Sequence, residues 1–384
     1  MILQDAWVTR HGTQALCAAL GLSGYRALFV GGCVRNALLG APVVDIDLAT
    51  DALPAKVVEI AEAAGFRVIP TGIDHGTVTV IAQGVHHEVT TFRRDVETDG
   101  RRALVAFSTD IAEDAARRDF TMNALYAEPS GKVIDPLGGI NDLRARRVRF
   151  VGDPERRIRE DYLRILRFFR FHAAHGDPSQ GLDAEGLAAC AALADGIDGL
   201  SRERIGAEMR KLLGAGDPAP AVAAMALCGV LAHVLPGGDA RPLAVLVHLE
   251  QDFHPRWQRR LAILGGDIAG LRLSRAEEAE ISRIRDEIGT MTAPVALGWT
   301  LGEVPAQDVL LCRAALLEIP LPANWQAEVQ RGAGSVFPVS ASDLMPQMFG
   351  PALGTTLRIL QAAWLASGLT MGKTALLQIA QNGG

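Results

Sequence analysis

Along the first 140 residues, short apolar runs alternate with glycine, proline and polar residues, which predicts a small sheet with flanking helices. A helix is expected within residues 1–25 and another from residue 34 to Gly40. A third is expected from Leu53 to Ala64, with Pro54 in its first turn. The predicted strands are 26–30, 45–50, 66–70, 76–84 and 86–92, and a polar loop is expected at 94–109.

Beyond about residue 140, apolar residues recur at helical spacing. One helix is expected over residues 158–171 and another, capped by Ser201, over 201–213. The apolar stripe of the first of these helices consists of Ile158, Tyr162, Ile165 and Phe169. Breaks between further helices are expected near 214–220, 235–242 and 318–325. The pattern therefore predicts an α+β fold in which a mixed sheet with flanking helices precedes an all-helical remainder.

The composition indicates a soluble chain of several domains. The 384 residues exceed one ordinary core, so two to four domains are expected. No apolar run reaches the length of a membrane span, and the first residues carry no signal pattern, so no membrane partner is expected. Five scattered cysteines without a C-x-x-C pair favour reduced thiols, which predicts a cytoplasmic location.

The charge distribution is more informative than the net charge of −6. Between Arg144 and Arg170 lie ten arginines against four acidic residues. Further arginine pairs occur at 93–94, 101–102 and 117–118. Any single arginine is explained by an ordinary solvated helix, but the clustering favours a surface that faces a polyanion.

A pair of aspartates, Asp45 and Asp47, is the first candidate for chemistry. Side chains alternate along a strand, so the two carboxylates face one way, with Cα atoms roughly 7 Å apart. They repel each other unless cations lie between them. A solvent-facing edge strand or turn is the alternative for the pair taken alone. Glu88, on a later predicted strand and on the same face as Thr90, is a candidate third acid, and a solvated glutamate is its alternative.

A glycine pair, Gly31 and Gly32, lies between a predicted strand and a predicted helix, with Arg35 shortly after it. Such a turn lets the backbone approach a phosphate, although a tight turn without a ligand has the same sequence. The carboxylate pair begins ten residues after Arg35. An anion site beside a carboxylate pair is what nucleotidyl transfer with two Mg²⁺ ions needs. The histidines near residues 75–87 have no ligand spacing, so zinc is not expected.

Several segments occur in an order and spacing that resembles the class II tRNA nucleotidyltransferase and bacterial poly(A) polymerase family of the DNA polymerase β superfamily. They are LFVGGCVRNALLGAPVVDIDLAT, EVTTFRRD, EDAARRDFTMNALY, DPLGGINDLRARRVRFVG, REDYLRILRFFRF and SRERIGAEMRKLL. The resemblance runs from about residue 26 to 215. It implies a polymerase-β-like head at 1–140, a helical neck at 141–215 that recognises the base, a helical body at 216–300 and a tRNA-binding tail at 301–384.

The resemblance also implies a role for each matching residue. The catalytic acids would be Asp45, Asp47 and Glu88, with the first two holding Mg²⁺. The nucleotide would be bound by Gly31, Gly32, Arg35, Arg118, Asp119, Asn123, Asp161, Arg164, Arg167 and Arg170. In this set, Asp119 would favour ribose over deoxyribose. Glu203, Arg204 and Glu208 would brace the base-reading helix, and residues 94–109 would form a flexible loop.

Hydrogen-bond chemistry supports the base-reading role of Asp161 and Arg164. An ionised aspartate only accepts hydrogen bonds and an arginine only donates them. Cytosine and adenine both present an amino donor beside a ring-nitrogen acceptor, whereas uracil and guanine present the reverse order. One such pair therefore selects C and A, because each unmatched buried polar group costs about 1–3 kcal/mol.

Three positions depart from the family pattern. Asn36 replaces a common aspartate beside Arg35, and an amide there accepts a hydrogen bond without the negative charge. Val44 replaces a common lysine and Ala103 a common proline. The catalytic groups are retained.

The leading functional hypothesis is addition of CCA to the 3′ end of tRNA from CTP and ATP, with tRNA as the partner. Poly(A) polymerase activity and partial CC- or A-addition are the enzymatic alternatives. The segment TGIDHGTVTV resembles the CCA-adding branch. A non-catalytic RNA-binding module is the alternative of another class, and the retained acids argue against it.

Overall fold

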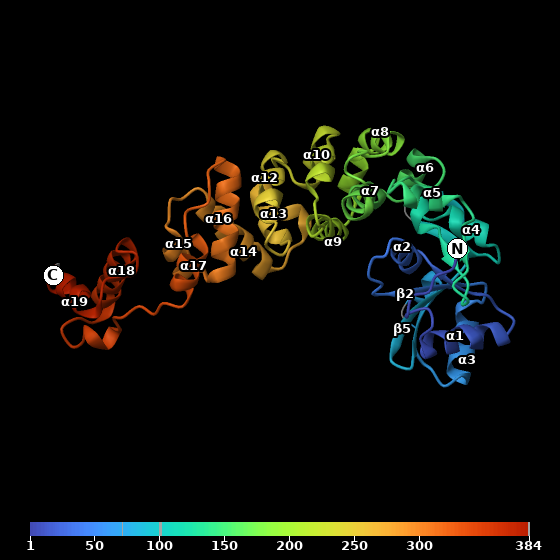
Figure 1. Ribbon diagram of the computed structural model, residues 1–384, viewed down its shortest axis with the longest axis horizontal. Coiled ribbons are helices and arrows are strands. Elements are labelled where there is room, and N and C mark those ends of the chain that lie inside the picture. The colour runs from blue at the N-terminus through green and yellow to red at the C-terminus, as the bar shows by residue number, and fades with distance from the viewer. Residues whose placement is uncertain (71, 100–101, 383–384) are drawn as a thin grey trace. The chain divides into compact units, whose positions relative to one another are not determined.

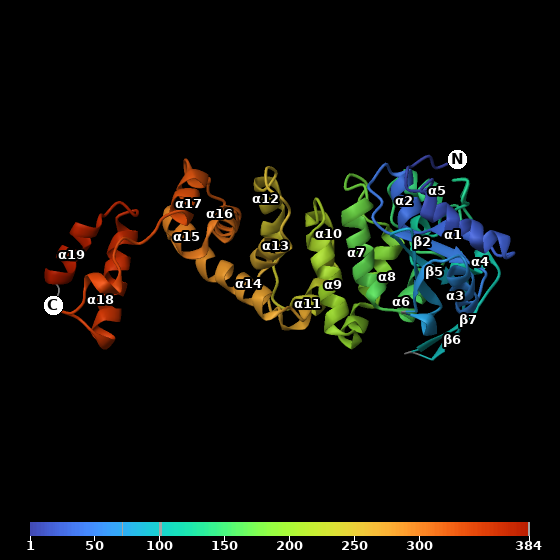
Figure 2. The same cartoon turned by 90° about the horizontal axis from the view of Figure 1, so that it is seen from below.

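The computed structural model describes residues 1–70, 72–99 and 102–382 and divides into two compact units, Met1–Val234 and Leu235–Gly384. Figures 1 and 2 show the sheet and its flanking helices in the first unit and helices alone in the second. This confirms the predicted α+β class. The finer division at residues 140, 215 and 300 stays a prediction.

The first unit holds the strands and eleven of the helices of the described residues. Its strands are β1 (Ala27–Val30), β2 (Ile46–Thr50), β3 (Arg67–Ile69), β4 (Thr77–Ala82), β5 (Val85–Thr91), β6 (Arg93–Asp99), β7 (Arg102–Phe107), β8 (Tyr126–Ala127) and β9 (Val133–Ile134). Its α-helices are α1 (His11–Leu22), α2 (Gly32–Leu38), α3 (Pro54–Ala63), α4 (Ile111–Ala116), α5 (Gly139–Arg144), α6 (Pro154–Glu160), α7 (Leu163–His175), α8 (Ala184–Ala192), α9 (Arg202–Leu213), α10 (Ala219–Leu227) and α11 (Val230–Val234). Short 3₁₀ helices are η1 (Ile73–His75), η2 (Thr121–Asn123) and η3 (Ala194–Gly199).

A mixed sheet of seven strands organises this unit, in the order β3-β4-β5-β2-β1-β8-β9. The β2–β5 pair is parallel and the other neighbours are antiparallel. All five predicted strands are confirmed, with ends within two residues of the expected ones. The two-residue strands β8 and β9 were not predicted, because so short a segment shows no alternation.

One face of the sheet is covered by α1 and α3, which contact strands β4 and β5 (Figures 1 and 2). On β5, His87, Val89 and Thr91 are buried on the face of these helices, whereas His86 and Glu88 on the other face are exposed. Helix α1 comes very close, since a Cβ at Gly12 would lie 2.3 Å from the carbonyl oxygen of Ala82. Apolar packing thus occupies this face and leaves the acidic residues on the other.

A second core lies on the acid-bearing face of the sheet and joins it to α4 and the segment after it. Its buried members are Leu28, Val30, Ala49, Phe92, Ala115, Ala124, Tyr126 and Val151. Because strands β1 and β2 contribute residues to this core on the same face as Asp47, the acidic site is built on packed elements rather than on a free edge.

Two expectations about secondary structure are wrong. Residues 93–107 form an antiparallel hairpin, β6 with β7, in place of the expected loop, and residues 100–101 lie outside the described part. Valine, leucine and phenylalanine in this segment favour a strand, which the polar composition concealed. The expected single helix over 158–171 is two helices, because Asp161 adopts an extended backbone (φ −158°, ψ 105°) between α6 and α7.

The remaining helices follow the predicted pattern. Helix α9 begins after Ser201 as expected, where the Ser201 side chain accepts a hydrogen bond from the backbone nitrogen of Arg204, and the helix buries Ile205 and Met209. The predicted break at 214–220 lies between α9 and α10. Among the described residues, none of the helices has the length and apolar character needed to span a bilayer.

The named elements in the described part of the second unit are all helices. Its elements are α12 (Arg241–Leu249), α13 (Trp257–Leu264), η4 (Ala269–Leu271), α14 (Arg275–Ile288), α15 (Pro294–Leu301), α16 (Glu303–Leu317), α17 (Trp325–Ala333), η5 (Ala341–Asp343), α18 (Gly350–Ala366) and α19 (Lys373–Asn382). Buried Arg259 donates to Glu250 at 2.6 Å and to Asp308 at 3.0 Å, which satisfies these charges inside the helices. Near its end, Trp364 packs edge-on against Trp299 and Phe337.

Candidate active site

The three predicted acidic residues lie at one end of the parallel β2–β5 pair. Asp47 and Glu88 are register partners on these adjacent strands, and Asp45 directly precedes β2. Ile46 is buried while Asp45 is exposed and Asp47 half-buried, so the predicted alternation is present. The structure thus brings Glu88, forty-one residues away in sequence, next to Asp47.

Asp47 is the acid most affected by this arrangement. Burial, together with the nearby charges of Glu88 and Asp45, raises its pKa to about 6, although Arg118 acts in the opposite direction. An ionised Asp47 is therefore unfavourable here unless positive charge is added. A divalent cation would supply that charge.

The donor set fits a hard divalent cation that keeps part of its shell for a substrate. Carboxylate oxygens are the ligands that such ions prefer. Within residues 1–70, 72–99 and 102–382, no group of three His, Cys, Asp or Glu side chains is arranged to coordinate a metal ion without other ligands. Mg²⁺ usually binds to one or two carboxylates together with substrate phosphates, so Asp45 and Asp47 suffice in this mode.

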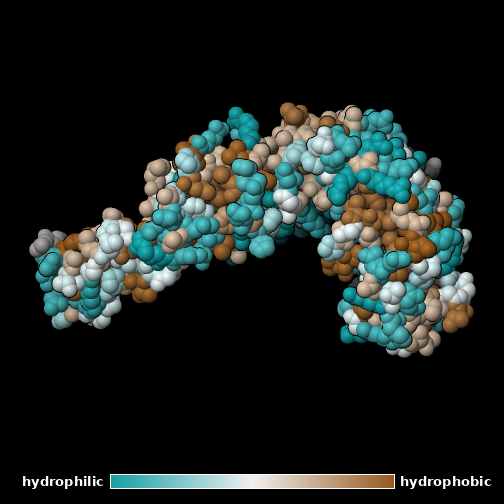
Figure 3. Space-filling view, viewed as in Figure 1, coloured by the Kyte–Doolittle hydropathy of each residue, from teal (hydrophilic) through white to brown (hydrophobic). Residues whose placement is uncertain are grey.

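The predicted glycine turn lies between β1 and α2, as expected. Gly31 has a left-handed backbone (φ +69°), and a Cβ there would lie 3.3 Å from Nη1 of Arg118. Gly31 therefore meets both a backbone and a space requirement that glycine alone satisfies. Space-filling Figure 3 shows hydrophobic residues gathered on the surface of the first unit near α2.

Two residues that were not among the predicted site residues, Tyr126 and Asp114, orient the side chain of Arg118. Its Nε donates to the hydroxyl of Tyr126 and its Nη2 to Asp114, each at 3.0 Å. Asp114 also accepts from Tyr126 at 2.6 Å and from Arg117 at 3.0 Å. Burial alone would raise the pKa of Asp114, but Arg118 and Arg117 lower it to about 2. The spacing of Asp114 three and four residues before the arginines is the signal that indicates these pairs.

A chain of hydrogen bonds joins four other predicted nucleotide-binding residues. Arg35 donates to Oδ1 of Asn123 at 2.5 Å, and Nδ2 of Asn123 donates to Asp119 at 3.0 Å. Arg167 donates to the other oxygen of Asp119 at 2.8 Å. Burial lowers the pKa of Arg35 to about 10, whereas the pKa of Asp119 is lowered despite burial because Arg167 faces it. The fold thus brings together residues from α2, the segment before η2, η2 itself and α7.

Three of the predicted arginines surround one aromatic ring. The guanidinium carbons of Arg35, Arg167 and Arg170 lie 5.1, 5.3 and 4.3 Å from the ring centre of Phe171. Glu208 on α9 accepts from Nε of Arg170 at 2.5 Å, so it braces α7 as expected. The ring and the glutamate hold the three arginines close together, and with Asp119 and Glu208 as their partners one positive charge of this cluster stays unbalanced.

The two predicted base-reading residues have other partners. Asp161 accepts from Arg204 at 2.6 Å and from the backbone nitrogen of Leu163 at 3.1 Å. Arg164 donates to Glu160 at 2.6 Å. Asp161 and Arg164 lie three residues apart as predicted, but Asp161 precedes α7 instead of lying on it. The bracing residue Arg204 therefore touches a predicted base-reading group directly.

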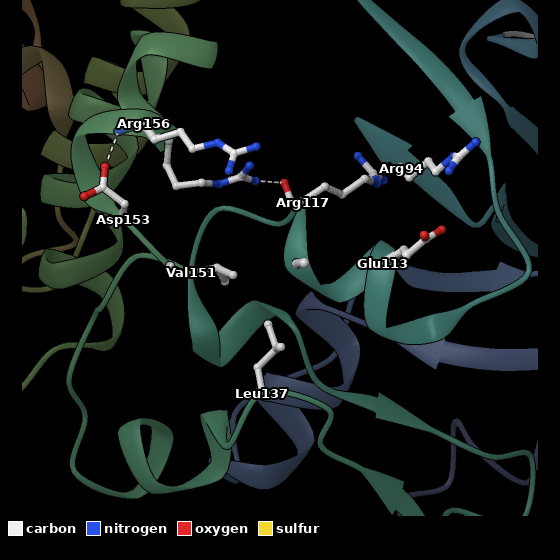
Figure 4. Close-up of a pocket in the computed structure, with 10 residues that line it drawn as sticks. Arg94, Glu113, Arg117, Leu137, Val151, Asp153 and Arg156 are labelled. Carbon is white, nitrogen blue, oxygen red and sulfur yellow. Dashed lines mark hydrogen bonds between the residues drawn. The ribbon is translucent and has the colours of Figure 1, made fainter. Parts of the chain in front are cut away.

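A separate cavity of about 480 Å³ gathers arginines from distant parts of the chain (Figure 4). Arg94, Arg117 and Arg156 approach it from β6, the end of α4 and α6, over an apolar floor that includes Leu137 and Val151. Arg117 is also paired with Asp114, while the side chain of Arg156 is 78% exposed. Three arginine clusters of the sequence thus meet at one place, as a polyanion-facing surface requires.

Acids in register across two parallel strands, a glycine turn and clustered arginines are the features that nucleotidyl transfer needs. The model of the poly(A) polymerase head domain matches residues 27–149. The model described as the probable RNA and SrmB-binding site of polymerase A matches residues 181–241.

Relatives and solved structures agree with these matches. The human mitochondrial CCA tRNA nucleotidyltransferase 1 is 42% identical over 204 residues, 53% of this chain and 47% of that protein. Its counterpart in Danio rerio is 34% identical over 370 residues, 90% of this chain and 85% of that protein. The crystal structure of the Bacillus stearothermophilus CCA-adding enzyme in complex with CTP has a TM-score of 0.75 and 30% identity, with 97% of each chain covered.

The chain belongs to the family of CCA-adding tRNA nucleotidyltransferases. The matched region spans about half the length of the human relative. Nucleotidyl transfer of this type uses divalent metal ions.

Proposed function

We propose that the protein adds CCA to the 3′ end of tRNA from CTP and ATP, with release of pyrophosphate and without a nucleic-acid template. The observation that carries the proposal is the register of Asp47 with Glu88 beside the Gly31 turn, on a fold that matches a CTP-bound CCA-adding enzyme over nearly the whole chain. The family includes poly(A) polymerases, so addition of A alone is the alternative that the experiment must separate.

Asp45 and Asp47 are the proposed ligands of Mg²⁺, and Glu88 is the third catalytic acid. When bound, Mg²⁺ neutralises triphosphate charge and lowers the pKa of the attacking 3′-hydroxyl of the RNA. The protein holds Asp47 and Glu88 on two hydrogen-bonded strands, with Asp45 directly before the first, so their spacing is set before substrate binds. Ionisation of Asp47 is the step that its environment opposes, which couples metal binding to loss of a proton.

The triphosphate is proposed to lie against Gly31, Gly32, Arg35 and Arg118. Both arginines are oriented by fixed partners, Asn123 for Arg35 and Asp114 for Arg118. A guanidinium that is already oriented loses less rotamer entropy when it binds an oxyanion. Asp119 and Asn123 are the proposed ribose contacts.

Asp161 and Arg164 are proposed to read the base, with Arg167 and Arg170 nearby on α7. One oxygen of Asp161 is held by Arg204, and a carboxylate has further lone pairs that can accept from a base amino group. The pairs of Asp161 with Arg204 and of Arg164 with Glu160 keep both groups oriented before a nucleotide arrives. Specificity for C and A then follows from the fixed order of acceptor and donor.

The proposed macromolecular partner is tRNA, contacted by the arginines of residues 93–94, 117–118 and 144–170. Phosphate contacts of this kind weaken steeply with salt. The arginine cavity of Figure 4 supports the proposal because two of its guanidinium groups, on Arg94 and Arg156, come from residues 62 positions apart in the sequence. A reducing, cytoplasmic compartment is proposed from the cysteine pattern.

The direct test is incubation of the purified protein with Mg²⁺ and a tRNA that lacks its last three nucleotides. With CTP alone we expect two additions, and with CTP and ATP we expect three and then arrest. Long tails with ATP alone would replace this proposal with poly(A) polymerase activity. No addition with any nucleotide would leave RNA binding as the function.

Substitution of the acids separates catalysis from binding. Asp45→Ala and Asp47→Ala should abolish incorporation while tRNA affinity, measured by filter binding, stays within about twofold. Asp195→Ala is the matched control, since Asp195 is fully exposed in the same unit. Incorporation at the wild-type rate by either variant would contradict the assignment of metal ligands.

A further inference from the structure

We propose that Asn36 is a positioning residue that ties the triphosphate-binding arginine to the segment leading into the metal-binding strand. Its side-chain amide does two things at once. Oδ1 accepts from Nε and Nη2 of Arg35, at 3.1 and 2.8 Å, and Nδ2 donates to the carbonyl oxygen of Pro42 at 2.9 Å. The inference rests on the proposed roles of Arg35 and Asp45.

The turn after α2 is folded back onto Asn36. The backbone carbonyl of Asn36 accepts from Leu39 at 3.1 Å and from Ala41 at 2.9 Å. With the bond to Pro42, three hydrogen bonds of one residue fix the path of the chain through this turn. Asp45 follows Pro42 by three residues, a span of about 10 Å at most. A displaced Pro42 carbonyl therefore displaces the first metal ligand.

An asparagine performs this double role and an aspartate does not. A carboxylate at position 36 still accepts from Arg35, and with more strength because it is charged. Its second oxygen, however, would face the carbonyl oxygen of Pro42, and two acceptors at hydrogen-bond distance repel each other. The Asn36→Asp substitution thus keeps the interaction with Arg35 and breaks the hydrogen bond to Pro42. Asn36→Ala breaks both.

Two binding measurements report separately on the interactions of Asn36 with Pro42 and with Arg35. Binding of Mn²⁺ in the absence of nucleotide, followed by electron paramagnetic resonance, reports on Asp45 and its neighbours. Binding of CTP in EDTA, followed by calorimetry, reports on Arg35. The charge-matched control is Asn141→Asp, at an exposed position on α5. Circular dichroism melting confirms that each variant is folded.

We expect Asn36→Asp to bind Mn²⁺ about three- to tenfold more weakly than wild type, the equivalent of one hydrogen bond. Added negative charge alone would strengthen cation binding, so the expected change has the opposite sign to a charge effect. Asn36→Ala should weaken Mn²⁺ binding similarly and CTP binding more than Asn36→Asp does. Asn141→Asp should change neither.

Unchanged or tighter Mn²⁺ binding by Asn36→Asp would overturn the link to the metal site. Unchanged CTP binding by Asn36→Ala would overturn the link to Arg35. The proposed function fails differently, through a wild-type protein that binds Mn²⁺ and CTP but adds nothing to tRNA. If the wild type binds neither ligand, the inference and the proposed roles are both wrong.

Discussion

Replacement of Asp114 by asparagine tests whether a buried carboxylate orients Arg118 for the triphosphate. The carboxylate is 1% exposed and accepts four hydrogen bonds. The donors are the backbone nitrogen of Arg93 and the side chains of Arg117, Arg118 and Tyr126. An asparagine of the same shape has one oxygen, so its NH₂ group must face at least one of these donors.

The expected cost follows from two independent considerations. The pKa of Asp114 is lowered to about 2 from the ordinary value of 3.8, which corresponds to roughly 2–3 kcal/mol of preference for the charged form. Breaking a buried ion pair costs about 3–5 kcal/mol. Because the pKa is lowered, this stabilisation is complete above about pH 4 and is lost as the pH falls through about 2. We expect Asp114→Asn to lose roughly 3 kcal/mol at pH 7.

Hydrogen-exchange mass spectrometry at pH 7 measures this loss of stability peptide by peptide. A local measurement is needed because a single free energy of unfolding is not well defined for a chain of two compact units. Peptides that cover β1, α4 and β8 should exchange about a hundredfold faster in Asp114→Asn. Tyr126→Phe, which removes one hydrogen bond, should have a smaller effect of about 1 kcal/mol. Asp195→Asn, at an exposed site, is the control. Wild-type exchange and wild-type CTP affinity in Asp114→Asn would refute the reasoning.

Three further predictions concern the same unit. In metal-free protein, stability should fall as the pH rises from about 4 through about 6, since Asp47 must then ionise against a raised pKa. Asp47→Asn should therefore raise the melting temperature at pH 8 in EDTA, and a melting temperature at or below wild type would contradict this. Arg204→Met removes the ion pair with Asp161. In single-nucleotide assays this substitution should raise the KM for CTP about tenfold and change kcat less. An unchanged KM would show that Arg204 is structural. Arg164→Ala should relax selection among the four NTPs more than it weakens tRNA binding, and unchanged selection would count against base reading.

Much of the fold was predictable because its signals are local. Strand alternation, Pro54 at the start of α3 and the glycine turn at Gly31 each depend on a few neighbouring residues. All five predicted strands and the helix after Ser201 are confirmed for this reason. The hairpin of β6 and β7 was missed because charged residues in its sequence outweighed its strand-forming ones.

By itself, the sequence determined which residues are the candidates for the chemistry, through the alternation that separates Asp45 and Asp47 from Ile46 and through the glycine turn before α2. Only the tertiary structure decided their partners. The parallel pairing of β2 with β5 places Glu88 opposite Asp47, and the fold joins Arg204 to Asp161. The physical reason is the distance over which each signal acts. A backbone pattern depends on a few neighbouring residues. A long side chain instead pairs with whichever opposite charge the packing of distant elements brings beside it.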